Sequence, residues 1–134
     1  MVYDYSDPID LFRSVLVECP KAGMSKAVDR EAFICDPING NILVEVEVKK
    51  VMASNARPYL VDCYTFDGGN KEEKVLSSKL LLKLGDDLRK DLGVMLMFKF
   101  MNSLWSQNQI AYQGHPCQTL VYRIVPMAAD FGAI

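Results

Sequence analysis

The sequence predicts an α+β domain, and three stretches of the 134-residue chain predict it. Residues 42–49 alternate apolar and polar side chains, which is the period-two pattern of a half-buried strand. Residues 59–66 are rich in β-branched and aromatic side chains and favour a second strand. Residues 79–105 combine a leucine-rich strand, a turn at Gly85 and a long run of apolar residues at helical spacing. Half of the chain is hydrophobic, so one core of ordinary size is expected.

The N-terminal segment predicts a helix. Ser6 or Asp7 can cap it, Pro8 suits its first position, and Pro20 ends it. One face of this helix is apolar, formed by Ile9, Phe12, Val15, Leu16 and Cys19. Residues 25–33 predict a second short helix, although their apolar period is weak. A turn cluster at residues 36–40 then precedes the strand at 42–49.

The second half of the chain predicts the third strand at residues 77–84, preceded by a turn and charge run at 67–74 that is typical of a solvated loop. A helix is predicted from Asp87 to about Asn108, because Asp86 and Asp87 suit a helix N-terminus. Two apolar stripes predict that this helix is buried on two sides. The stripes are Val94, Met97, Phe98, Met101, Leu104 and Trp105, and nearby Leu88, Leu92 and Leu96. Residues 109–119 predict a connection, followed by strands at 120–125 and 131–134.

Two places could meet a bound anion. The loop at residues 52–58 is small and polar, so its backbone amides can approach a phosphate, although such a loop is more often a plain hairpin connection. Lys83 is an ammonium at the end of a leucine-rich strand and could reach an anion if that strand lines a cleft. Taken alone, a strand lysine more often faces solvent at an edge.

Charge and cysteine usage exclude several classes. The net charge of −2 gives no reason to predict nucleic-acid binding or a polybasic membrane contact. Cys19, Cys35, Cys63 and Cys117 lie far apart, and His115 is the sole histidine, so no zinc-ligand spacing is present. Free thiols in a reducing compartment are expected. The acidic N-terminus and the lack of a long apolar run predict a cytosolic chain.

Residues 83–91 read Lys-Leu-Gly-Asp-Asp-Leu-Arg-Lys-Asp and closely resemble the Lys-x-Gly-Asp-Asp-Leu-Arg-Gln-Asp signature of the phosphatidylinositol 3-/4-kinase family. The chain departs at Lys90, where the family usually has glutamine, and at Gly93, where it usually has a larger residue. Residues 36–60 resemble the family's first two catalytic-domain strands and its phosphate loop, with a Ser-x-x-x-Pro pattern from Ser54 to Pro58. Residues 122–125 and 132–134 resemble the last two strands of its small lobe.

The resemblance implies a kinase-like small lobe over residues 36–134, with an antiparallel sheet of about five strands packed on one long helix, behind an N-terminal helical segment at residues 1–35. It implies that Lys83 and Ser54 contact the phosphates of ATP. Asp91 would face the lysine from the helix, and Tyr122 would line the same pocket. The catalytic base, the magnesium ligands and the adenine-binding hinge belong to a large lobe outside these residues, so no catalytic or metal-binding residue is expected in this chain.

By the same resemblance, the parent protein would be a kinase that transfers the γ-phosphate of ATP to the inositol ring of phosphatidylinositol, and this chain alone would be inactive. Its partners would be ATP, magnesium and membrane phosphatidylinositol, at a cytoplasmic location peripheral to membranes. A regulatory protein partner is left open.

Residues 55–60 and 122–125 resemble the type III alpha phosphatidylinositol 4-kinases most closely, which favours the 4-position. Residues 104–108 instead resemble the Ile-Trp-Gln-Asn of class I and II 3-kinases, so a 3-kinase is the alternative. An alternative of another class is a kinase-like module that binds a partner and catalyses nothing.

Overall fold

The structure is a computed structural model that describes residues 8–19, 21–28 and 34–134. A six-stranded antiparallel sheet has the strand order β1-β2-β3-β4-β8-β7, and β5 and β6 form a separate two-stranded hairpin. The elements in chain order are α1 (Pro8–Glu18), β1 (Ser25–Ala27), β2 (Glu45–Val51), β3 (Tyr59–Asp67), β4 (Asn70–Leu84), α2 (Arg89–Gln107), β5 (Ala111–Tyr112), β6 (His115–Pro116), β7 (Val125–Ala128) and β8 (Phe131–Ala133). The predicted α+β class and antiparallel sheet are therefore confirmed.

The hairpin of β3 and β4 forms the centre of the sheet. Val61, Cys63, Leu80 and Leu82 point to one face and are fully buried there. The pairing of Asp67 with Asn70 closes the hairpin over the predicted turn. The charge run at residues 71–74, predicted as a loop, instead lies inside β4, and residues 72–74 are exposed. That prediction was wrong because charge reports where side chains point, whereas the backbone of this stretch pairs with β3.

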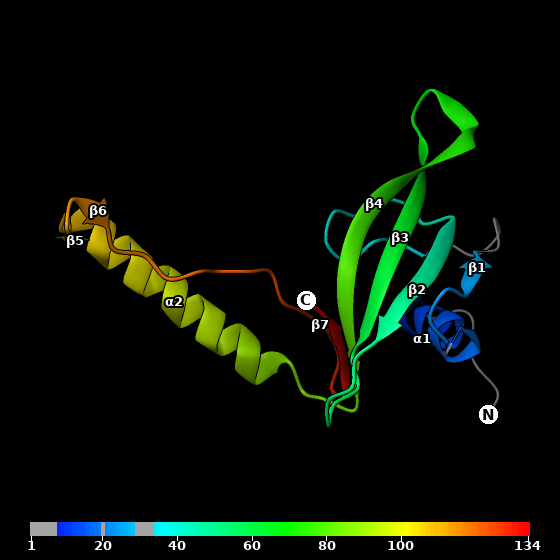
Figure 1. Ribbon diagram of the computed structural model, residues 1–134, viewed down its shortest axis with the longest axis horizontal. Helices are drawn as coiled ribbons and strands as arrows, with labels where there is room; N and C mark the ends of the chain where they lie inside the picture. Colours follow the sequence, from blue (N-terminus) through cyan, green and yellow to red (C-terminus); the bar gives the residue numbers. More distant parts are fainter. Residues whose placement is uncertain (1–7, 20, 29–33) are drawn as a thin grey trace.

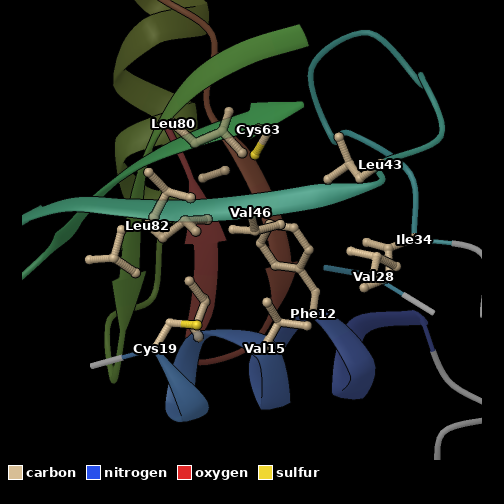
Figure 2. Close-up of a cluster of buried hydrophobic side chains, with 14 of the residues drawn as sticks. Phe12, Val15, Cys19, Val28, Ile34, Leu43, Val46, Cys63, Leu80 and Leu82 are labelled. Carbon is tan, nitrogen blue, oxygen red and sulfur yellow. The ribbon is translucent and has the colours of Figure 1, made fainter. Parts of the chain in front are cut away.

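α1 covers the apolar face of the sheet (Figure 2). Its predicted start at Pro8 is confirmed, and Phe12, Val15, Leu16 and Cys19 of its predicted inward face are buried. The side chain of Ile9 lies outside the described part of the chain. The ring of Phe12 lies 6.2 Å from that of Phe131 in β8, measured between centroids. α1 and the sheet thus share one hydrophobic core. The division at residue 35 stays a prediction about domain organisation.

The segment between α1 and β2 differs from its prediction. Residues 25–27 form β1, which pairs with β2 through Ser25 and Glu47, so the predicted second helix is wrong there. Residues 29–33 and the predicted cap residues Ser6 and Asp7 lie outside the described residues. β2 begins only at Glu45. Val46 and Val48 are buried as predicted, whereas Ile42, predicted on the same face, is 51% exposed because the strand does not extend to it.

The long helix α2 was expected to lie on the sheet and extends away from it instead (Figure 1). Its first half rests on the return segment, which we define as residues 117–124 leading from β6 back to the sheet. A small second core joins them, formed by Leu88, Leu92, Met95, Phe98, Val121, Ile124 and Ile134. The predicted strand at 120–125 is found only at Val125, because the return segment packs on α2 and joins no strand ladder.

Burial of α2 on two sides was also predicted wrongly. The side away from the return segment exposes Val94, Met97, Phe100 and Leu104, at 41–63% of their surface. Apolar periodicity shows which faces of a helix suit burial, but it does not show that this chain supplies a cover for each face. The helix itself is confirmed, within about two residues of its predicted ends.

The close approach of β8 to the start of α2 gives a testable prediction. A Cβ at Gly132 would lie 2.6 Å from Cδ1 of Leu88 and 2.7 Å from the carbonyl oxygen of Val125. Gly132→Ala should therefore lower the free energy of unfolding by about 1–3 kcal/mol, as overpacking of a tight contact usually does. Gly93→Ala is the control, because nothing lies within 4 Å of its Cβ position and alanine improves helix propensity by about 1 kcal/mol. Urea denaturation that ranks the two variants the other way would contradict the packing described here.

Candidate functional site

Lys83 lies on the face of the sheet opposite α1. Side chains alternate along a strand, and Leu80 and Leu82 of β4 enter the core, so Lys79, Leu81 and Lys83 face the other side. Within the sheet Lys83 pairs with Gly132 of β8, and Leu88, just before α2, lies over Gly132 on the same face. The Lys83 side chain is 22% exposed, so it is partly buried. We call this side of the sheet the open face.

The turn after Lys83 is fixed by backbone hydrogen bonds. Gly85 has φ of +76°, a conformation that suits glycine, and its amide donates to the carbonyl of Asp130 at 2.7 Å. The amide of Asp86 donates to the same carbonyl at 3.3 Å. This turn brings Asp86 back toward the strand, where its Oδ2 lies 3.2 Å from Nζ of Lys83. The ammonium is thus held by a neighbouring carboxylate at the end of β4.

The loop between β2 and β3 lies at the same end of the sheet as Lys83. The register shows this, because Val51 pairs with Tyr59 and Tyr59 pairs with Leu82 (Figure 1). Ser54 is exposed at the tip of this loop, and its carbonyl accepts a hydrogen bond from the amide of Arg57 at 3.0 Å. The loop is therefore a hairpin connection in form, and it places exposed residues near the end of β4.

Arg89, Lys90 and Asp91 of the motif lie in the first turn of α2, and Asp87 lies just before it. The guanidinium of Arg89 donates to both carboxylate oxygens of Asp87, at 2.8 and 2.7 Å, and the Arg89 amide donates to the same carboxylate at 3.1 Å. Asp87 therefore satisfies a backbone donor at the helix start, as predicted, whereas Asp86 pairs with Lys83. Asp91 is half-buried in the first turn. The described ion pairs join Lys83 to Asp86 and not to Asp91, so the facing role of Asp91 stays a prediction.

The pairing with Arg89 predicts a pH dependence at the start of α2. The side-chain hydrogen bonds from Arg89 lower the pKa of Asp87 from 3.8 to about 2. Because the folded pKa is the lower one, the contribution of this group to stability is complete above about pH 4 and is lost as the pH falls toward 2. We expect the carboxyl carbon of Asp87 to titrate by NMR with a midpoint near 2. Arg89→Ala should return the midpoint toward the ordinary value, and an ordinary midpoint in the unaltered chain would contradict the pairing.

Tyr122 lies on the return segment, beside α2. It lines a hollow of about 310 Å³ between α2 and the return segment, together with Leu92, Met95, Leu96, Lys99, Val121, Arg123 and Ile124. Lys83, Ser54 and Asp91 do not line this hollow. The structure therefore brings Lys83 and the Ser54 loop to one end of the sheet, and places Tyr122 along the helix.

Two buried carboxylates were not predicted as site residues. Asp62 lies in β3 next to Lys79 of β4, is 6% exposed, and has one carboxylate oxygen without a hydrogen-bond partner among the described residues. The sequence could have indicated Asp62, because it is a charged residue within the otherwise apolar and aromatic strand at 59–66. Asp36 is 1% exposed and accepts hydrogen bonds from the hydroxyl of Ser77 at 2.7 Å and the amide of Ile38 at 2.8 Å. Asp36 therefore has a structural role, because it fixes the loop before β2 against β4.

The open face carries both cationic and acidic side chains, since Lys79 and Lys83 share it with Asp62. Lys83 and a loop of exposed small and polar residues lie at one end of the sheet, and ammonium groups and loop amides can both bind phosphate oxygens. No group of three or more histidine, cysteine or acidic side chains in the described part of the chain could hold a metal ion.

The four cysteines are free thiols, and burial raises the pKa of Cys63 to about 12, which makes that thiol unreactive.

Comparison with known proteins shows a sequence similarity to a human protein. The chain is similar to the human phosphatidylinositol 3-kinase C2 domain-containing subunit gamma. The two are 32% identical over 81 residues, which is 60% of this chain and 5% of that protein. The chain therefore spans a small part of the length of the relative it matches. No model of a protein family matches the chain. Among the described residues, neither helix is long and apolar enough to cross a membrane.

Proposed function

We propose that this chain is the ATP-binding small lobe of a phosphatidylinositol kinase. The observation that carries the proposal is the position of Lys83. The lysine of the Lys-x-Gly-Asp-Asp-Leu-Arg motif faces away from the core, beside the one loop whose sequence resembles a phosphate loop. The similarity to a protein named as a phosphatidylinositol 3-kinase subunit supports the same proposal independently of the geometry.

In this proposal Lys83 offsets the negative charge of the ATP phosphates and Ser54 with its neighbouring amides contacts the same phosphates. Asp86 holds the ammonium in place while the cleft is empty, which is the role that the family resemblance implied for Asp91. Magnesium and the groups that orient the inositol hydroxyl would be supplied by a large lobe, so the chain alone would catalyse no transfer.

Binding of ATP to the isolated chain is the first test. Because only half of a nucleotide cleft is present in this proposal, we expect binding in the millimolar range and little heat in calorimetry. Amide chemical-shift mapping with magnesium-ATP should show changes at residues 52–58 and at Lys83 to Gly85. Lys83→Met should reduce these changes, whereas Lys79→Met, on the same face of β4, should not. Shifts confined to the hollow around Tyr122 would contradict the proposed site.

The proposal leaves two alternatives for the position of the inositol ring that is phosphorylated. Residues 55–60 and 122–125 favour the 4-position, whereas the name of the human relative and residues 104–108 favour a 3-kinase. These residues do not contact the inositol ring in either proposal. The two alternatives therefore differ in which phosphatidylinositol monophosphate the enzyme forms. Incubation of the full-length protein with phosphatidylinositol and labelled ATP, followed by separation of the monophosphate isomers, decides between them.

A kinase-like module without catalysis is the alternative of another class. The exposed apolar side of α2 favours it, because a binding module needs a surface for its partner. A full-length protein that carries no catalytic loop and forms no phosphatidylinositol phosphate would support this alternative and contradict the kinase proposal.

A further inference from the structure

The exposed side of α2 has the spacing of a helix-pairing seam. Gly93, Met97, Phe100 and Leu104 follow one another at intervals of four, three and four residues, which is the spacing of the core positions of a coiled coil. All four are exposed. The return segment packs on the other side of the helix (Figure 1). We call these four residues the α2 seam.

We propose that the α2 seam binds the α2 seam of a second copy of this chain, with the two helices antiparallel. This inference does not depend on the proposed function. A two-fold axis between Met97 and Phe100 brings each Phe100 against the Met97 of the second copy. It also brings each Leu104 against the Gly93 of the second copy. Nothing lies within 4 Å of the Cβ position of Gly93, so the space that Leu104 would fill is open.

The charges on α2 select the antiparallel direction. Arg89 and Lys90 lie at the N-terminal end, and the last turn carries no basic residue. Arg89 is paired with Asp87, whereas Lys90 is exposed and has no ion pair among the described residues. An antiparallel pair places Lys90 beside the carbonyl end of the other helix, where a cation is favourable. A parallel pair would place the two Lys90 ammonium groups side by side.

Two other occupants fit the seam less well. Helices that lie on anionic membranes carry many basic residues along their polar face, whereas α2 has three basic residues, and its side opposite the seam packs on the return segment through Leu88, Leu92 and Met95. A helix of another protein would need acidic residues opposite Lys90, but it would not need the match of Leu104 with Gly93. An antiparallel second copy accounts for both the position of Lys90 and the match of Leu104 with Gly93.

The test is sedimentation equilibrium of the purified chain across the micromolar range. The expected result is a reversible increase from the monomer mass of 15.1 kDa to twice that mass. Leu104→Glu should weaken the association by at least tenfold. Leu120→Glu is the matched control, since Leu120 is 83% exposed on the return segment, outside the seam, and its replacement should leave the association unchanged.

Two further variants test the direction and the fit. Lys90→Gln should weaken an antiparallel pair and strengthen a parallel one. Gly93→Leu should weaken the pair by filling the space that Leu104 occupies, and circular dichroism should show that its helix is intact. A chain that stays monomeric at all concentrations, or a dimer unaffected by Leu104→Glu and Gly93→Leu, would overturn the proposal. Binding to anionic vesicles by a monomer would point to the membrane instead.

Discussion

Lys83→Met should lower the proposed lipid kinase activity of the full-length protein by roughly 10²–10³-fold, the loss that follows removal of one preorganised electrostatic contact. The structural reason is that Lys83 is the cation of β4 closest to both the loop at residues 52–58 and the start of α2. Methionine keeps most of the length of the partly buried side chain and removes the charge. The measurement is the rate of phosphatidylinositol phosphorylation with labelled ATP.

The fold of the Lys83→Met variant should be unaffected. Its ion pair with Asp86 lies at the surface, and such pairs usually contribute about 0–1 kcal/mol. The melting temperature should therefore change by only a few degrees. Lys79→Met is the matched control on the same face of β4 and should retain activity. Retained activity together with a large loss of stability in Lys83→Met would assign Lys83 to the fold and not to phosphate.

Elements fixed by local chemistry were predicted correctly. The proline at the start of α1 and the β-branched run of β3 each specify a backbone conformation within a few residues. β1 was missed because Ser25–Ala27 becomes a strand only by pairing with Glu45–Glu47, which lie far along the chain. The return segment was misread for the opposite reason, since its apolar residues suit a strand but lie against α2.

The candidate site was predictable in part. The motif located Lys83 and its turn, and the turn depends on the positive φ of Gly85, which a glycine before two aspartates indicates. Which aspartate pairs with Lys83 could not be predicted, because Asp86, Asp87 and Asp91 are all near in sequence and only the backbone path separates them. The described path assigns Asp86 to the lysine and Asp87 to Arg89.

Phe12→Ala should lower the free energy of unfolding by about 3–5 kcal/mol, the usual cost of removing a buried phenylalanine. Phe12 is 1% exposed, and its side chain packs from α1 against Phe131 of β8. Small domains are stable by only about 5–15 kcal/mol, so this loss is a large part of the total. Urea unfolding followed by circular dichroism measures it, and the single cooperative transition should move to lower urea with its slope retained.

Val17→Ala is the control on the same helix, because Val17 is 54% exposed and its replacement should change stability by about 0.5 kcal/mol or less. The pair of variants also tests whether α1 belongs to the sheet domain. Since α1 supplies Phe12, Val15, Leu16 and Cys19 to the core that contains Val46, Val61 and Leu82, the sheet should unfold together with the helix. A Phe12→Ala variant that loses helix signal while β3 and β4 keep their amide protection would place a domain boundary before residue 36 after all.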